Sequence, residues 1–109
     1  MVSFQQQRID ALKAMLNDNP DDPFALYGLA LEYKATGEID DAIELLKRAV
    51  DRDQPEPYAF YQLGELSHAA GKSEAARTAL QTGLKVAEER GEMKAYNELN
   101  ELLSLIDEG

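Results

Sequence analysis

The chain contains no cysteine and no tryptophan, and only one histidine among its 109 residues. Without cysteine it can form no disulfide, no thiolate zinc site and no cysteine nucleophile. Basic residues are also scarce: 11 lysines and arginines stand against 21 aspartates and glutamates, so the net charge is -10. Nucleic-acid binding requires a basic surface that displaces counterions from phosphates. The composition therefore predicts no nucleic-acid partner.

Long hydrophobic runs are absent as well. The most apolar stretch, Phe24 to Leu31, has eight residues and includes a glycine, whereas a membrane-spanning helix needs about 20 residues. Met1 to Gln7 has neither the basic start nor the apolar run of a signal peptide. We therefore expect no membrane partner and a cytoplasmic location. With 44% hydrophobic residues, the chain is expected to fold as one soluble domain rather than remain a disordered acidic tail.

The sequence repeats itself at an offset of 34 residues without a gap. Pro23 aligns with Pro57, and Gly37 aligns with Gly71. Between and beyond these pairs, residues of the same kind or size coincide at about a dozen positions. A fixed period of this length is typical of helical repeat proteins.

Each repeat is expected to contain two helices joined by a tight turn. Asp22 can cap the start of the first helix, and Pro23 occupies its first position, where a missing N–H is harmless. This helix should run to about Ala35 and end at Gly37, a residue that adopts the left-handed conformation easily. A second helix should start near Ile39. The second repeat should follow the same plan, with helices from Pro57 to about Ala70 and from Ser73 to about Arg90.

Small residues stand where the two helices of a repeat must cross. They are Ala30, Ala42 and Ala49 in the first repeat and Gly64, Ala76 and Gly83 in the second. A glycine within a helix is unfavourable by about 1 kcal/mol relative to alanine. Gly64 and Gly83 therefore predict a close approach of two backbones. Larger apolar side chains should fill the space on either side: Leu26, Leu29, Tyr33, Leu46 and Val50.

These residues resemble the motif of the tetratricopeptide repeat. The first copy comprises Leu26, Leu29, Ala30 and Tyr33 followed by Ala42 and Leu46, and the second comprises Phe60, Leu63, Gly64 and Ser67 followed by Ala76 and Leu80. Ser67 departs from the tyrosine of the family. The closing proline is one place late at Pro55 and is replaced by Glu88 in the second copy, so the last helix of that copy should be longer. The resemblance implies an all-α, right-handed helical solenoid.

The two ends of the chain complete a single tetratricopeptide-like domain of about six antiparallel helices. Residues 1–22 are expected to form an N-terminal helix that corresponds to half a repeat. Residues 23–56 and 57–90 form the two full repeats, and residues 91–109 form a capping helix. Terminal helices with a polar outer face keep a solenoid soluble.

No pattern of catalytic residues is found. His68 is the sole histidine, and its neighbour Ser67 does not give the geometry of a catalytic triad. The acidic pairs lack the glycine and closing glutamate of a calcium-binding loop. No phosphate-binding glycine loop and no nucleophile elbow occurs. We therefore expect a protein that is not an enzyme and has no metal and no cofactor.

A second apolar stripe runs along the first helix of each repeat, beside the residues that the core needs. In the family, these positions line a concave groove that holds peptides, so the resemblance implies a non-catalytic scaffold for a peptide or protein of apolar or aromatic character. Many family members that bind the tails of heat-shock chaperones do so through a clamp of lysine, asparagine and arginine on these helices. In this chain the corresponding positions hold Tyr27, Leu31, Gln62 and Tyr96, so the resemblance does not extend to that clamp. The expected groove residues are Phe24, Tyr27, Leu31, Lys34, Tyr58, Tyr61, Glu65 and His68.

Two further possibilities for this stripe stay open. Neighbouring helices could simply bury it, which would make it part of the core. Alternatively, the same stripe could join two copies of the chain in a homodimer, and the protein would then be a self-associating structural module.

Overall fold

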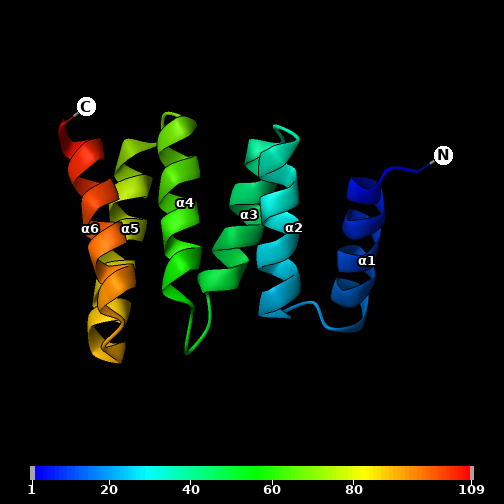
Figure 1. Cartoon of the computed structure of the whole chain (residues 1–109), viewed down its shortest axis with the longest axis horizontal. Coiled ribbons are helices and arrows are strands. Elements are labelled where there is room, and N and C mark those ends of the chain that lie inside the picture. The colour runs from blue at the N-terminus through cyan, green and yellow to red at the C-terminus, as the bar shows by residue number, and fades with distance from the viewer. Residues whose placement is uncertain (1, 109) are drawn as a thin grey trace. The chain divides into compact units, whose positions relative to one another are not determined.

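The structure, a computed structural model, describes residues 2–108. Over this range the chain forms six α-helices and no strand, as the repeat pattern predicts (Figure 1). The helices are α1 (Phe4–Asp18), α2 (Pro23–Ala35), α3 (Ile39–Val50), α4 (Pro57–Ala69), α5 (Ser73–Arg90) and α6 (Met93–Glu108). The fold is therefore an all-α helical repeat.

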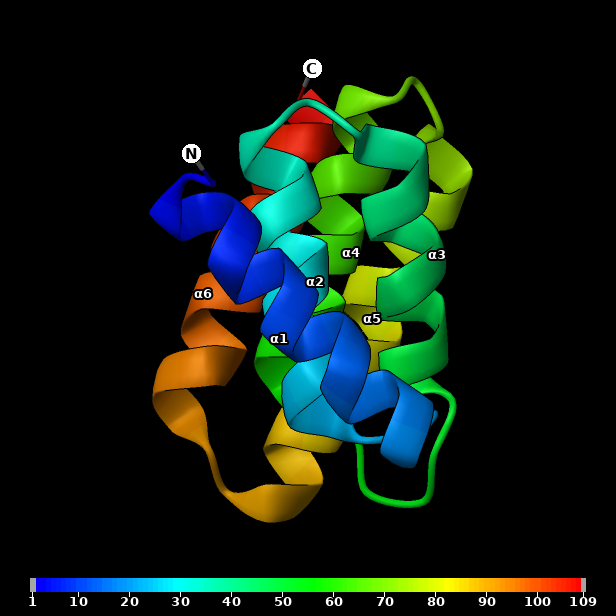
Figure 2. The same ribbon diagram turned by 90° about the vertical axis from the view of Figure 1, so that its right-hand side faces the viewer.

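The helices form two compact units, Met1–Asp51 and Arg52–Gly109. In the first unit, α2 packs against α3 in an antiparallel hairpin, and α1 packs on α2 (Figure 2). In the second unit, α4 and α5 form the equivalent hairpin, and α6 packs on both of them. Each unit thus consists of one helical hairpin and one additional helix that covers part of it.

The helices begin where the sequence supplies a cap. An oxygen of the Asp22 carboxylate accepts hydrogen bonds from the backbone N–H groups of Phe24 and Ala25, at 3.0 and 3.4 Å. Ser3 caps α1 in the same manner, because its hydroxyl oxygen accepts a hydrogen bond from the backbone N–H of Gln6. Both α2 and α4 have a proline at the start, where the ring fixes a helical φ and no hydrogen bond is lost. The expected starts of α2, α3, α4 and α5 are all confirmed.

Three helices end in the same left-handed turn. Gly37, Gly71 and Gly91 follow α2, α4 and α5 with φ values of +82°, +79° and +68°. In each turn the N–H of the next residue donates to a carbonyl in the last turn of the helix, as Lys72 does to Ser67. A side chain with a Cβ rarely adopts this φ, which explains why glycine occupies these positions.

The expected close approach of helices is found at both crossing glycines. A Cβ at Gly64 would lie 2.6 Å from Cγ of Leu80, and one at Gly83 would lie 2.6 Å from Cβ of Phe60. Ala42 and its counterpart Ala76 have no exposed surface. The small residues therefore hold α4 and α5 at a distance that any larger side chain would increase.

The cores of the two units contain the leucines and alanines expected from the repeat. Leu26, Leu29 and Leu46 are buried, whereas Tyr33 and Val50, which were expected beside them, are only half-buried. In the second unit α5 has 18 residues, six more than α3, which confirms the predicted extension. The N-terminal helix is shorter than expected because α1 ends at Asp18, where Asn19 takes an extended conformation ahead of Pro20.

Candidate functional site

The candidate site in the first unit is a stripe on α2. Phe24, Tyr27, Leu31 and Lys34 all lie on this helix, at spacings of three or four residues, so they share one face. The Phe24 side chain is 70% exposed, and the other three residues are half-buried. Tyr27, Leu31 and Lys34, which the sequence places among the groove residues, are therefore only partly accessible.

The second unit carries the equivalent stripe on α4. Tyr58, Tyr61, Glu65 and His68 repeat the same spacing. Tyr58 is 38% exposed, Tyr61 and Glu65 are half-buried, and His68 is exposed. We use the name aromatic stripe for these two sets of four residues, one on α2 in the first unit and one on α4 in the second. Its aromatic part lies in the first half of each helix, and its polar part lies in the second half.

The most buried large side chains of α2 and α4 lie outside the aromatic stripe. On α2 the core residues are Leu26 and Leu29, which are 1% and 3% exposed, and on α4 they are Phe60 and Leu63, at 4% and 8%. Phe24 is the most exposed aromatic side chain of the stripe, at 70%. The packing of α2 on α3 therefore does not need Phe24. Fully exposed aromatic rings are unfavourable in water, and they are common anchors at protein interfaces.

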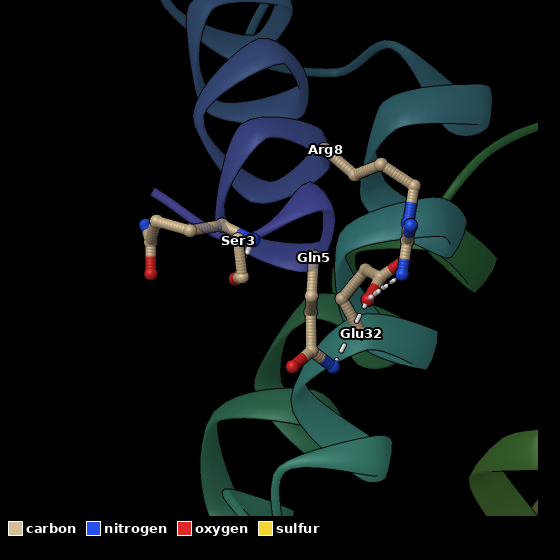
Figure 3. Close-up of polar contacts among 5 residues, drawn as sticks. Ser3, Gln5, Arg8 and Glu32 are labelled. Carbon is tan, nitrogen blue, oxygen red and sulfur yellow. Dashed lines mark hydrogen bonds and ion pairs between the residues drawn. The ribbon is translucent and has the colours of Figure 1, made fainter. Parts of the chain in front are cut away.

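In the first unit, α1 covers the side of α2 that neighbours the stripe. Leu12 of α1 lies over Gly28, where its Cδ2 would be 3.1 Å from an added Cβ. Arg8 of α1 forms an ion pair with Glu32 of α2, with 2.6 Å between Nε and Oε1, and Gln5 donates to the other carboxylate oxygen (Figure 3). These contacts fix α1 on the flank of α2 and leave the stripe uncovered by this helix at Phe24.

The ion pair between α1 and α2 changes the acidity of its members. The hydrogen bond from Arg8 is the main cause that lowers the pKa of Glu32, and the hydrogen bond from Gln5 acts in the same direction, while burial opposes them. The same contact raises the pKa of Arg8. The Glu32 side chain is 16% exposed, so its charge is compensated by a partner rather than by water.

In the second unit, apolar packing takes the place of this ion pair. The repeat places Leu66 at the position of Glu32, and Leu66 is 2% exposed. Ser67, which stands where the family has tyrosine, is also buried, at 3%. Both residues belong to α4, against which α6 packs.

An arginine secures the loop before the first helix of each hairpin. Arg48 of α3 donates to the carbonyl of Pro20, three residues before α2, at 2.5 Å. Arg90 of α5 donates to the carbonyl of Pro55, two residues before α4, at 3.0 Å. These bonds position the N-terminal turns of α2 and α4, from which Phe24 and Tyr58 project. The repeat alignment did not reveal them, since the two arginines are not equivalent in the 34-residue register.

Neither a cluster of metal-ligating side chains nor a membrane-spanning helix is found among the described residues. Between residues 2 and 108, no three histidine or acidic side chains lie close enough to hold a metal ion. None of the helices in this range is both long and apolar enough to span a bilayer. His68 is exposed on α4 and its neighbour Ser67 is buried, so the two side chains do not face the same environment.

Comparison with known proteins agrees with the repeat. A family model described as "Tetratricopeptide repeat" matches residues 9–57 and 27–91. A curated relative, the TPR repeat-containing protein PA0015 of Pseudomonas aeruginosa, is 31% identical over 99 residues, which cover 91% of this chain and 94% of the relative. The chain therefore belongs to the tetratricopeptide repeat family, as its motif indicated.

Two solved structures share the fold. The solution structure of protein BPP2914 from Bordetella parapertussis has a TM-score of 0.77 and 27% identity, covering 99% of this chain and 90% of that chain. The crystal structure of MamA has a TM-score of 0.66 and 24% identity, covering 93% of this chain and 71% of that chain. These similarities confirm the helical repeat fold.

Proposed function

We propose that the protein is a non-catalytic scaffold that binds a peptide or protein segment through the aromatic stripe. Proteins of the tetratricopeptide repeat family are generally non-catalytic scaffolds that bind other proteins, and membership of the family supports this role. The single observation that carries the proposal is Phe24. It is a large aromatic side chain that the core does not need, and 70% of it is in water.

The chemistry of the stripe defines the kind of segment that it suits. Phe24, Tyr27 and Leu31 offer apolar surface on α2, and Tyr58 and Tyr61 offer it on α4. A ligand with aromatic or aliphatic side chains would remove this surface from water, which stabilises a complex by about 25 cal/mol per Å². The polar half of the stripe adds Lys34, Glu65 and His68, which can orient polar groups of the ligand.

A pair of phenylalanines allows a matched test. Phe24 and Phe4 are 70% and 81% exposed, and each occupies the first turn of a helix. Only Phe24 belongs to the stripe. The intact chain with Phe24→Ala and Tyr58→Ala would be used as bait in a native lysate of the source organism, beside the wild type and the Phe4→Ala variant. Captured proteins would be quantified by mass spectrometry.

The proposal expects a set of partners that the wild type and Phe4→Ala retain and the Phe24→Ala, Tyr58→Ala variant loses. Buried aromatic anchors commonly contribute about 2 kcal/mol or more each, so capture should fall at least tenfold. Equal capture by all three baits would refute the proposal that the aromatic stripe binds these partners. Light scattering on the same variants tests the homodimer: a wild-type dimer that only the stripe variant converts to monomer would identify the stripe as a self-association surface instead.

A further inference from the structure

One face of α6 carries two leucines that lie among glutamates without an ion-pair partner. Leu102 is half-buried and Leu105 is 61% exposed. Glu98, Glu101 and Glu108 lie at helical spacing around them, so the five side chains share one face of the helix. We call these five residues the α6 ridge. At 1.5 Å per residue the ridge is about 15 Å long.

The charge of the α6 ridge is not neutralised within the chain. Among the described residues, Glu98, Glu101 and Glu108 form neither an ion pair nor a side-chain hydrogen bond. Two other acids of the second unit are paired, Asp107 with Arg77 and Glu92 with Arg90. The one lysine of α6, Lys94, lies one turn before Glu98, at the end of the ridge away from the leucines.

We propose that the α6 ridge is a docking surface for a cationic amphipathic helix of a partner protein. Leucines of such a helix would pack between Leu102 and Leu105 at the usual interaxial distance of about 8–10 Å. Its lysines or arginines would reach the three carboxylates, and their aliphatic stems would cover the exposed part of Leu105. Charge complementarity of this kind accelerates association and selects the partner.

The same charges disfavour the other occupants. A second copy placed ridge against ridge would bring three glutamates against three glutamates, and each chain already has a net charge of -10. Nucleic acids and anionic membranes carry charge of the same sign as the ridge. The α6 ridge shares no residue with the aromatic stripe, so this inference goes beyond the proposed function and does not depend on it.

A pair of designed peptides tests the charge preference with the full-length chain. The probe is a short, fluorescein-labelled helical peptide with leucines at positions i, i+3, i+4 and i+7 and lysines at the other positions. In the comparison peptide, glutamate replaces every lysine. Fluorescence anisotropy should detect binding of the lysine peptide alone, and its affinity should fall with added salt, because exposed charges are screened within about 10 Å at 0.1 M. Equal binding of both peptides, or of neither, would overturn the proposal.

Two variants that each lose two negative charges, one on the α6 ridge and one elsewhere, show whether the peptide binds at the ridge. Glu98→Gln with Glu101→Gln removes two charges from the ridge and keeps the helix propensity. The control, Glu88→Gln with Glu89→Gln, removes two exposed and unpaired charges from α5. The first variant should bind the lysine peptide about fivefold more weakly, and the control should bind like the wild type. Equal losses in both variants would mean that only the net charge of the chain attracts the peptide, which would overturn the ridge as the docking surface.

A third variant tests the apolar part of the α6 ridge. Leu105→Ala should weaken the lysine peptide about tenfold, since it removes most of the exposed leucine surface. Its melting temperature should match that of the wild type, because Leu105 is 61% exposed. Unchanged binding by Leu105→Ala would refute the docking geometry. The Phe24→Ala, Tyr58→Ala variant should still bind this peptide, so failure of the proposed function and failure of this inference would be distinguishable.

Discussion

The crossing of α4 and α5 makes a quantitative prediction for Gly83→Ala. A Cβ at Gly83 would lie 2.6 Å from Cβ of Phe60 and 3.2 Å from Cδ2 of Leu99. Two carbons in contact prefer a separation of about 3.5–4.0 Å, so the overlap with Phe60 is about 1 Å. The Cβ of Phe60 is attached to the backbone of α4, and no rotamer change can move it. α4 and α5 must therefore separate.

Two opposing effects determine the magnitude. Alanine stabilises a helix interior by about 0.5–1 kcal/mol relative to glycine. Overpacking a tight core typically costs about 1–3 kcal/mol. We expect the overpacking to dominate at Gly83, where Leu99 of α6 crowds the same site, and the second unit to lose about 1–2 kcal/mol. For a domain of 60–100 residues this corresponds to a fall in the melting temperature of about 4–15 °C.

Gly28→Ala is the matched control, because it places the same substitution within a helix. An added Cβ would there meet only the side chain of Leu12, with Cδ2 at 3.1 Å, the end of a half-buried side chain on α1 that can move by a few tenths of an ångström. This variant should be neutral or more stable by up to about 1 kcal/mol. Urea unfolding followed by circular dichroism measures both. A Gly83→Ala protein as stable as the wild type, or less affected than Gly28→Ala, would refute the close-approach argument.

Three further predictions concern the cap, the core and the net charge. Asp22→Ala removes the acceptor for the N–H groups of Phe24 and Ala25 and should destabilise the first unit by about 1 kcal/mol in a thermal melt; an unchanged melt would show that the cap is dispensable. Ala76→Leu replaces a side chain with no exposed surface and should cost about 1–3 kcal/mol, so a neutral result would contradict the repeat register. With a net charge of -10, the wild-type melting temperature should rise between low and moderate salt, because screening reduces self-repulsion; a fall would mean that the paired charges dominate.

Most of the fold could be predicted because the information is local and repeated. Proline starts, glycine ends and small crossing residues occur twice at a distance of 34 residues, and each has a direct structural meaning. Gly37 and Gly71 have the predicted left-handed φ, and Gly64 and Gly83 have the predicted close neighbours. A second copy of the same pattern makes chance agreement improbable and sets the register of the helices.

The contacts of the terminal helices could not be predicted, because they fall outside this repetition. Glu32 is charged and Leu66 is apolar at equivalent positions, and the alignment alone does not show which neighbour each one meets. The structure supplies the reason: Glu32 meets Arg8 of α1, and Leu66 is buried in the unit where α6 packs on α4. Similarly, the acids and leucines of α6 are visible in the sequence, but only the structure shows which of them stay unpaired and exposed.

The different attachment of the two terminal helices predicts that acid releases α1 first. Ile9 is the one buried side chain of α1 in the described range, so the ion pair of Arg8 and Glu32 adds to a small apolar contact. The hydrogen bond from Arg8 lowers the pKa of Glu32 in the folded state, and a lowered pKa stabilises the folded state above the unfolded value. This stabilisation is lost as the pH falls below the ordinary glutamate pKa of about 4.3 and through the folded one. Hydrogen exchange should therefore show the amides of α1 losing protection relative to α3 in this acidic range. Glu32→Gln should remove the pH dependence of that difference. If α1 and α3 lose protection together, or if the difference persists in Glu32→Gln, then the ion pair does not hold α1 on α2.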